Sequence, residues 1–330
     1  MKAAVYYNNE DIRIEEVPLP KIQEGEILVK VRASGICGTD VMEWYRIKKA
    51  PRILGHEISG DIADSRSDKY KLGQRVFVSH HVPCGECNFC RSGDETACEM
   101  LHKGNYEPGG FAQFIRVPRE NVERGTYILP DSVSYEEATM IEPLACAVRG
   151  LRVIRLQSQH TVLVLGSGVS GLLNIKLAKL SGARVIATDI DPYRLKKATE
   201  YGADQVINAK DGLKGVKADR VILCTGAASA VNEAFNCAQR KGIILLFAVP
   251  AKNIETPNAD FWRNELTLVS SYGAAPKDLQ EALDLIAAGK VDIKAMITHR
   301  LPLENCQEGF KIVSQAKESL KVVLIPSMEN

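Results

Sequence analysis

Residues 161–171, Thr-Val-Leu-Val-Leu-Gly-Ser-Gly-Val-Ser-Gly, join a short apolar run to three closely spaced glycines. The run predicts a buried strand, and the apolar spacing after the glycines predicts a helix over 170–181. Gly166 allows a tight turn, Gly168 lets the backbone approach a pyrophosphate, and Gly171 lets the helix pack on the strand. The motif alone is weak evidence, but here it has the preceding strand and following helix that a dinucleotide site requires.

The acid expected in such a site is Asp189, 23 positions after Gly166. A carboxylate there accepts hydrogen bonds from both ribose hydroxyls and repels a 2′-phosphate, so the sequence favours NAD over NADP. We expect the phosphates at the helix N-terminus, where the free N–H groups around Val169 and Ser170 favour negative charge. Arg194, five residues after Asp189, either softens this preference or is a solvated helix residue.

Strands and helices alternate strictly from about Arg152 to Ser270. The expected strands cover 161–165, 184–188, 205–207, 220–224, 242–248 and 266–270, and the expected helices cover 170–181, 192–201 and 228–240. Alternation of this kind implies right-handed crossovers and a parallel sheet with helices on both faces. The sequence therefore predicts a doubly wound α/β domain.

The chain before and after this region has a different character. Short β-branched runs predict strands at 2–7, 26–33, 74–79 and 110–117, and the last part predicts a helix at 277–289 and ends in the apolar run 321–325. A chain of 330 residues also exceeds what one hydrophobic core usually organises. We predict a β-rich domain made of residues 1–145 and 272–330, into which the doubly wound domain, 146–271, is inserted.

The composition excludes several classes of protein. With 45% apolar residues, 25% charged residues and a formal net charge of +1, the chain has no general attraction for nucleic acid or an anionic membrane. No stretch approaches the roughly 18–20 apolar residues of a membrane helix, and the acidic N-terminal region does not resemble a signal peptide. Nine cysteines, an odd number, argue against a disulfide scaffold and favour a reducing cytoplasm with metal-bound thiolates.

Four of the cysteines are clustered in sequence. Cys84, Cys87 and Cys90 are separated by two residues each, and Cys98 follows after seven more. Two-residue gaps let a tight turn direct successive sulfurs at one centre, and four thiolates close a tetrahedral zinc shell. The main rival is an iron–sulfur site, whose bacterial signature ends with a three-residue gap and a proline. Because the last gap is seven residues and Glu99 follows, we predict a structural zinc site rather than a cluster or four unrelated thiols.

Three other residues are candidate ligands of a second metal ion: Cys37 in Gly-Ile-Cys-Gly-Thr-Asp, His56 in Leu-Gly-His-Glu and Glu142 in Ile-Glu-Pro. Each has an ordinary alternative, as a small core residue, a solvated histidine and a helix-end acid. Zinc in an open site acts as a Lewis acid and lowers the pKa of a bound hydroxyl. Thr39, two residues after Cys37, is placed to pass the proton of such a bound hydroxyl outward through its own hydroxyl; its alternative role is to cap a turn.

These motifs are accompanied by Gly-Gly-Phe-Ala-Gln-Phe at 109–114 and by the tail Ile-Thr-His-Arg-Leu-Pro-Leu-Glu at 297–304. Over essentially the whole chain, the combination resembles the zinc-containing medium-chain dehydrogenase family, in which a Rossmann domain is inserted into a GroES-like catalytic domain. Many alcohol dehydrogenases of that family have a cysteine as third ligand. The Glu-Pro pair at 142–143 is instead similar to the polyol (sorbitol-type) and threonine dehydrogenase branch.

The resemblance implies two zinc ions per chain and NAD as cofactor. Cys37 and His56 would bind the catalytic zinc, while Glu57 and Glu142 share or exchange the remaining coordination. Met42 stands where several members have a histidine near the proton relay. The proton would then leave through the cofactor ribose, water or another residue, and the sequence does not choose among these routes. The resemblance also implies that further residues contact the cofactor: Thr225, Val249 and Ser271 on the nicotinamide side, and Lys321 on the pyrophosphate. For Lys321 the alternative is a surface lysine on an edge strand.

The implied reaction is oxidation of a secondary alcohol, a polyol, cyclitol or related sugar alcohol, to the ketone with transfer of a hydride to NAD. The alternative is an L-threonine 3-dehydrogenase-like or other amino-alcohol dehydrogenase, and the resemblance implies a homo-oligomer, tetramer or dimer. Two further classes compete. A zinc-ribbon nucleic-acid module would need a basic stripe that residues 80–105 lack. A zinc-free reductase would be expected to lack Cys37, His56 and Glu142.

Overall fold

The computed structural model describes residues 1–250 and 252–326. The chain divides into two compact units, one formed by Met1–Pro143 with Gly273–Asn330 and the other by Leu144–Tyr272. The boundaries therefore fall two residues before and one residue after those expected from the sequence. Among the described residues, none of the helices has the length and apolar character needed for a membrane span.

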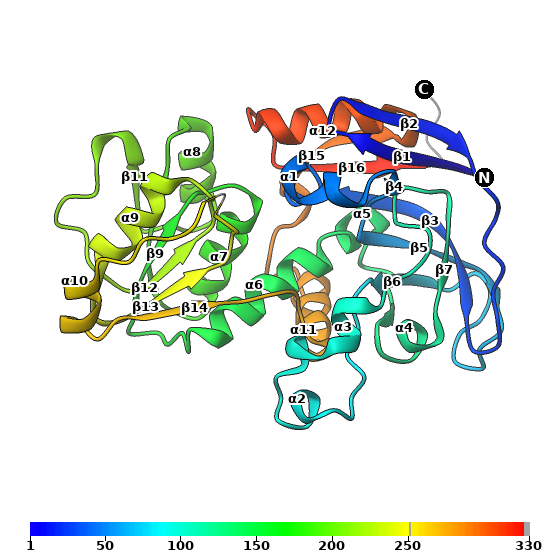
Figure 1. Ribbon diagram of the computed structural model, residues 1–330, viewed down its shortest axis with the longest axis horizontal. Helices are drawn as coiled ribbons and strands as arrows, with labels where there is room; N and C mark the ends of the chain where they lie inside the picture. The colour runs from blue at the N-terminus through cyan, green and yellow to red at the C-terminus, as the bar shows by residue number, and fades with distance from the viewer. Residues whose placement is uncertain (251, 327–330) are drawn as a thin grey trace. The chain divides into compact units, whose positions relative to one another are not determined.

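The unit formed by Leu144–Tyr272 is built on one parallel sheet of six strands, in the order β11-β10-β9-β12-β13-β14 (Figure 1). Its strands are β9 (Thr161–Leu165), β10 (Arg184–Asp189), β11 (Gln205–Asn208), β12 (Ala218–Leu223), β13 (Ala238–Leu246) and β14 (Thr267–Ser270). Its helices are most of α6 (Ile141–Val153), then α7 (Val169–Leu180), α8 (Pro192–Glu200), α9 (Ala228–Cys237) and α10 (Asn258–Arg263). The predicted doubly wound domain is confirmed. From β9 the sheet grows in one direction to β11, and from β12 it grows in the other direction to β14. Doubly wound sheets bind dinucleotides at the point between two such strands.

One predicted element in this unit ends early. The sequence predicts a helix over 228–240, but α9 ends at Cys237, and Ala238 is already extended and pairs with Ala218 of β12. The three residues that follow Ala238 are exposed. A further helical turn would therefore bury no apolar side chain, whereas the strand gains a partner in the sheet.

The other unit contains a seven-stranded sheet with the path β15-β16-β3-β5-β6-β8, in which β7 also pairs with β3, and a small sheet β2-β1-β4. The strands are β1 (Lys2–Asn8), β2 (Asp11–Glu16), β3 (Ile27–Ile36), β4 (Arg52–Ile53), β5 (Glu57–Ser65), β6 (Arg75–Ser79), β7 (Phe114–Val117), β8 (Thr126–Ile128), β15 (Ile297–Pro302) and β16 (Lys321–Ile325). Short helices join them, and α11 (Pro276–Ala287) and α12 (Cys306–Gln315) are the longest helices that lie wholly in this unit. The predicted β-rich domain is confirmed.

The sheet of this unit positions the candidate metal ligands. Strand β3 lies between β16 and β5, so that Gly35 is opposite Val323 on one side and Glu57 on the other. The inward side chains of β3, β5 and β6 form an apolar core that includes Val29, Ile58 and Val76. Because this core fixes the register of the strands, it also fixes which residues meet at the ends of β3 and β5.

Candidate active site and metal centres

The glycine-rich turn lies between β9 and α7 (Figure 1). Gly166 has a φ of +93°, a left-handed conformation that favours glycine, and a Cβ atom on Gly171 would lie 2.0 Å from the Gly166 carbonyl oxygen. Gly168 is the N-cap residue of α7, and no side chain caps this helix. The first N–H groups of α7 are therefore available to an anion such as a pyrophosphate.

Asp189, the last residue of β10, is held beside this turn. One carboxylate oxygen accepts a hydrogen bond from the Ser167 N–H at 2.8 Å, and the other accepts one from the Asp191 N–H at 3.0 Å. The side chain is buried, and each oxygen keeps a lone pair for a further donor. This arrangement is suited to accepting hydrogen bonds from ribose hydroxyls.

The other residues expected near the cofactor lie at the same edge of the sheet. Thr225, Val249 and Ser271 follow the carboxyl ends of β12, β13 and β14, the edge at which open α/β sheets bind ligands. The side chain of Arg194, on α8, extends toward the turn: its Nη1 lies 3.9 Å from the position that a Cβ atom on Gly168 would take. Their contacts with a cofactor stay predictions.

A second cluster forms where β3 ends and β5 begins. Cys37 directly follows β3, His56 directly precedes β5, and Glu57 is the first residue of β5. The antiparallel pairing of the two strands brings these residues together, and one ligand atom from each lies within 4.8 Å of the other two. Thiolate, imidazole and carboxylate are the ligand types of catalytic zinc sites. The Oε1 atom of Glu57 is buried and has no hydrogen-bond partner among the described residues, so a cation would complete its environment.

Glu142 and Thr39 were also predicted for this site. Glu142, at the start of α6 (Ile141–Val153), is buried. Burial is the main cause of the raised pKa of Tyr106, and Glu57 outweighs burial to raise the pKa of Lys321; the nearby charge of Glu142 adds a smaller contribution to each. It is not part of the group of converging ligand atoms found among the described residues. The hydroxyl of Thr39 donates to Cys37 Sγ at 3.3 Å, which places it next to a candidate metal ligand.

Asp40, to which the sequence analysis gave no role, lies directly behind His56. Its carboxylate is fully buried, and Oδ1 is 3.4 Å from His56 Nδ1 while Oδ2 accepts a hydrogen bond from the Cys37 N–H at 3.0 Å. Burial disfavours a charged imidazole, but Asp40 outweighs it and raises the pKa of His56 well above its ordinary value. A carboxylate on Nδ1 leaves Nε2 as the nitrogen for a metal, a common arrangement behind zinc-bound histidines.

Lys321 lies in the same cluster. It is the first residue of β16, an interior strand of the sheet, and its ammonium donates to Oε2 of Glu57 in a buried ion pair. A Cβ atom on Gly35 would lie 2.3 Å from Glu57 Oε2 and 2.7 Å from Lys321 Cε, so only glycine leaves room for the pair. The alternative of a surface lysine on an edge strand is therefore wrong. The Lys321 ammonium, which was predicted to contact a pyrophosphate, is paired with Glu57 instead.

The four clustered cysteines converge on one centre. The ligand atoms of Cys84, Cys87, Cys90 and Cys98 lie within 4.8 Å of one another. The Cys84 and Cys90 sulfurs are 3.8 Å apart, close to the roughly 3.8 Å edge of a tetrahedron with Zn–S bonds of about 2.3 Å. Burial raises the pKa of the Cys98 thiol, but hydrogen bonds from backbone N–H groups, including that of Cys84, outweigh burial and lower this pKa to about 6. This set fits a closed zinc shell.

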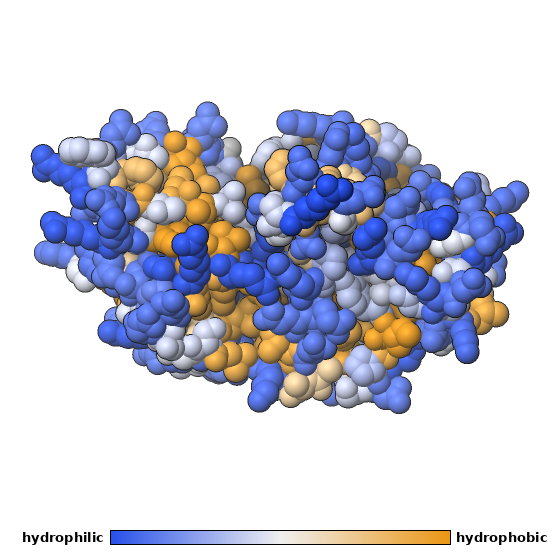
Figure 2. Space-filling view, turned by 90° about the horizontal axis from the view of Figure 1, so that it is seen from below, coloured by the Kyte–Doolittle hydropathy of each residue, from blue (hydrophilic) through white to orange (hydrophobic). Residues whose placement is uncertain are grey.

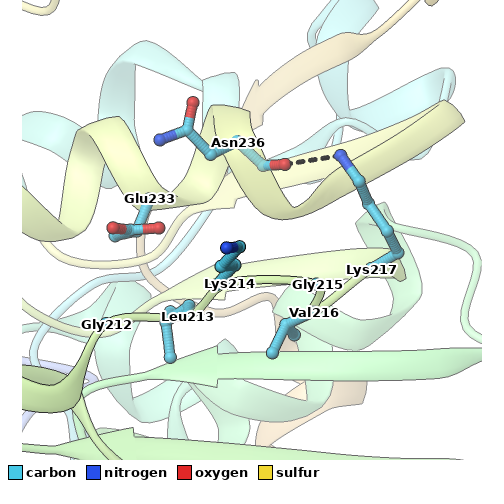
Figure 3. A pocket seen from close by; sticks show the side chains of 8 residues that line it. All are labelled: Gly212, Leu213, Lys214, Gly215, Val216, Lys217, Glu233 and Asn236. Atoms are coloured by element: carbon cyan, nitrogen blue, oxygen red, sulfur yellow. Dashed lines mark hydrogen bonds between the residues drawn. The ribbon is translucent and has the colours of Figure 1, made fainter.

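A separate cavity of about 400 Å³ lies in the unit formed by Leu144–Tyr272 (Figure 3). Its lining residues are Gly212, Leu213, Lys214, Gly215, Val216, Lys217, Glu233 and Asn236. It is formed by the segment that enters β12 and by α9, and Lys217 donates to the Asn236 carbonyl at 2.6 Å. It lies at the amino end of β12, opposite the edge at which doubly wound sheets bind dinucleotides, and contains none of the predicted site residues.

Sequence reasoning missed Asp40 and the ion pair of Lys321 with Glu57. It also missed Arg46, whose Nη2 donates to Thr39 Oγ1 at 3.0 Å. Asp40 had a detectable signal, since it follows Cys37 by three residues in a motif already assigned to metal binding. Arg46 had none, because it lies in a stretch with Lys48 and Lys49 that resembles an ordinary solvated surface. The Lys321 pair joins residues 264 positions apart, and no local pattern predicts such a contact.

Comparison with known proteins agrees with this geometry. The family model described as the alcohol dehydrogenase GroES-like domain matches residues 23–128, and that described as zinc-binding dehydrogenase matches residues 170–288. The sorbitol dehydrogenase of Bacillus subtilis (strain 168) is 34% identical, with 99% of this chain and 98% of that protein aligned. An L-threonine 3-dehydrogenase of Chelativorans sp. (strain BNC1) is 33% identical, with 98% of each protein aligned.

Structural similarity is equally extensive. A zinc-binding dehydrogenase of Sinorhizobium meliloti 1021, whose crystal structure contains NADP, has a TM-score of 0.86 at 28% identity and covers 98% of this chain and 99% of its own. The sequence similarity continues through the inserted domain and both parts of the domain that surrounds it. The chain therefore belongs to the zinc-dependent medium-chain dehydrogenase family.

Proposed function

We propose that this dehydrogenase oxidises a secondary alcohol, a polyol, cyclitol or related sugar alcohol, to the corresponding ketone with NAD as hydride acceptor. The observation that carries the proposal is the convergence of Cys37, His56 and Glu57 on one point, with the Thr39 hydroxyl beside them. We assign the catalytic zinc to these three ligands, with Glu142 as an exchanging fourth, and a structural zinc to the cysteines at 84, 87, 90 and 98.

When bound, the catalytic zinc would act as a Lewis acid that makes an alcohol hydroxyl acidic near neutral pH. Thr39 would accept the hydroxyl proton on Oγ1 as its own hydroxyl hydrogen turns away from Cys37 Sγ and leaves toward solvent. NAD, when bound beside Asp189 and the glycine turn at 166–171, would supply the hydride acceptor: the C–H bond of the same carbon would break with its electron pair going to the cofactor, and the C–O bond would become a carbonyl. The products are the ketone, NADH and one proton. Asp40 holds the His56 ring in orientation throughout.

The preference for NAD rests on Asp189. A buried carboxylate at the end of β10 accepts ribose hydroxyls and repels a 2′-phosphate. Because one relative was solved with NADP, the ratio of the two affinities is the relevant measurement. Fluorescence titration of wild type and Asp189→Ala should show weaker NAD binding and a smaller NAD advantage in the variant. An unchanged ratio would remove Asp189 from the cofactor site.

The substrate is tested with a panel of polyols, cyclitols and amino alcohols, followed by the absorbance of reduced nicotinamide. The likeness to a sorbitol dehydrogenase supports the polyol assignment, and the similar likeness to an L-threonine 3-dehydrogenase supports an amino-alcohol substrate as the second candidate. A higher kcat/KM for L-threonine than for any polyol would select the second. Turnover of neither class would overturn the proposed function.

We further propose a homo-oligomer, a dimer or tetramer, in the cytoplasm. Within the described residues β14 is an edge strand that pairs only with β13, and Trp262 of the preceding helix is 77% exposed. Figure 2 shows apolar side chains gathered among hydrophilic ones on the face that it displays. None of the nine cysteines forms a disulfide, which supports a reducing compartment. Light scattering would test the oligomeric state, and a monomeric mass would contradict it.

A further inference from the structure

The guanidinium of Arg46 forms three contacts with the residues around the candidate catalytic metal. Nε donates to the Thr39 carbonyl at 3.0 Å, and Nη2 donates to Thr39 Oγ1 at 3.0 Å and to Asp40 Oδ1 at 3.2 Å. The side chain is mostly buried, 17% exposed, and its guanidinium carbon lies 5.0 Å from the centre of the Tyr45 ring. A fork of donors bound to three acceptors holds these residues in one geometry.

These contacts define the hydrogen bonds of Thr39. Its Oγ1 accepts from Arg46 and donates to Cys37 Sγ, which leaves one oxygen lone pair for another donor. An alcohol hydroxyl held by the same metal as Cys37 is such a donor. The arrangement therefore fixes the position of Thr39 Oγ1 and leaves one acceptor position for a substrate hydroxyl.

The chemistry of the guanidinium limits what it does. Arginine stays protonated in proteins and has no acceptor, so Arg46 cannot relay the alcohol proton. It instead supplies a permanent positive charge one hydrogen bond behind Thr39, where negative charge develops as the alcohol oxygen loses its proton. Because the charge is held in place before the reaction, it needs no reorganisation during it.

We propose that Arg46 is a positioning residue for Thr39, which fixes the threonine hydroxyl and stabilises the deprotonated alcohol oxygen through it; the proposal rests on the proposed function above. The cation of Arg46 would favour loss of the alcohol proton without itself accepting that proton. Nothing in the local sequence distinguishes Arg46 from the neighbouring surface lysines.

The test is a double-mutant cycle on the zinc-loaded enzyme with the alcohol that wild type oxidises best. The variants are Arg46→Met, Arg46→Lys, Thr39→Val and the Thr39→Val, Arg46→Met double variant. Loss of a preorganised donor in contact with the reacting oxygen lowers kcat by about 10²–10³, so loss of one that acts through Thr39 should lower it about 10–100-fold. The KM for NAD should not change, and Arg46→Lys, which keeps the charge but not the fork, should recover part of the loss.

In the Thr39→Val background, Arg46→Met should lower kcat less than about 3-fold, because residues that act through one another are not additive. An equal loss of kcat in both backgrounds, or loss of the catalytic zinc from the Arg46→Met protein, would overturn the proposal. Either result would show that Arg46 acts by holding Asp40 or by stabilising the fold. Arg13→Met is the matched control, since Arg13 lies over Tyr7 and pairs with Asp11 away from the site. Unaffected Arg46→Met turnover would overturn the proposal alone, whereas absence of wild-type turnover would overturn the proposed function with it.

Discussion

Lys321 and Glu57 form a buried ion pair in which the ammonium donates to Oε2, with side chains 3% and 1% exposed. The two charges lie beside Cys37, the first residue after β3. The pair leaves Glu57 Oε1 without a protein partner among the described residues, and this oxygen is the one available to a metal. Lys321 therefore neutralises part of the negative charge that Cys37 and Glu57 bring to the cluster and fixes the orientation of the carboxylate.

Removal of one partner tests this pair. Lys321→Met should lower the free energy of unfolding by about 3–5 kcal/mol, because it removes the buried cation that pairs with Oε2 of Glu57. Urea unfolding of the zinc-loaded protein measures the change. Lys2→Met is the matched control, since Lys2 pairs with Glu304 at the surface and its loss should have little effect. A loss in Lys321→Met no larger than in the control would contradict a buried pair.

The contact between Asp40 and His56 makes a prediction about metal affinity. Asp40→Asn should weaken the catalytic zinc by about 10–100-fold, because the amide no longer anchors the imidazole with a full negative charge. Competition with a chromogenic chelator measures the affinity independently of activity. The zinc proposed for the four clustered cysteines is an internal control and should be retained. Equal loss of both ions would indicate general unfolding instead.

The structural zinc that we propose for the four clustered cysteines predicts a different phenotype. Cys98→Ser should remove one of the two zinc ions and lower the midpoint of thermal unfolding, since a closed zinc shell contributes directly to folding stability. Elemental analysis and thermal unfolding measure the two effects. Cys237→Ala, outside both metal clusters, should keep both ions. A Cys98→Ser protein that still binds two zinc ions would show that no zinc ion is held by these four thiolates together.

The pair formed by Glu26 and Arg116 predicts a dependence of stability on pH away from the metal sites. Burial alone would raise the pKa of Glu26, but hydrogen bonds from Arg116 and from the Gln23 N–H lower it below its ordinary value of 4.5. The pair therefore contributes its full stability above about pH 4.5, and the contribution is lost as the pH falls through the lowered pKa.

Arg116→Met should lower the free energy of unfolding by about 2 kcal/mol at pH 7, since hydrogen bonds to charged groups contribute about 1.5–3 kcal/mol. The difference from wild type should shrink as the pH falls below about 4. Urea unfolding from pH 3 to 7 measures it, with Arg119→Met as the control because Arg119 forms an exposed pair with Glu123. A difference that stays constant with pH would show that the pair contributes through packing alone.

Local patterns account for most of the fold and part of the site. The glycine turn at 166–171 and the cysteine cluster at 84–98 are each formed by residues close together in the sequence. Both could therefore be predicted from residue spacing alone. The end of α9 at Cys237 was predicted three residues late, because pairing between Ala238 and Ala218 overrides the local helical preference.

The remaining site features depend on contacts that only the folded sheet creates. Lys321 meets Glu57 because β16 and β5 flank β3, and the missing side chain of Gly35 gives the pair its space. Arg46 reaches Thr39 across a short helix, α1 (Glu43–Arg46), whose sequence gives no sign that its last residue turns back toward the metal ligands. Such contacts follow from strand order and register, which residue spacing alone does not determine.

The central claim is that Cys37, His56 and Glu57 hold a catalytic zinc for alcohol oxidation by NAD. The most direct measurement compares kcat of wild type and His56→Ala on the best secondary alcohol of the panel, with NAD affinity and zinc content determined on the same samples. The account predicts that the variant binds NAD as wild type does, keeps the structural zinc, loses the catalytic one and has no measurable turnover. Turnover at the wild-type rate by the His56→Ala protein would contradict it.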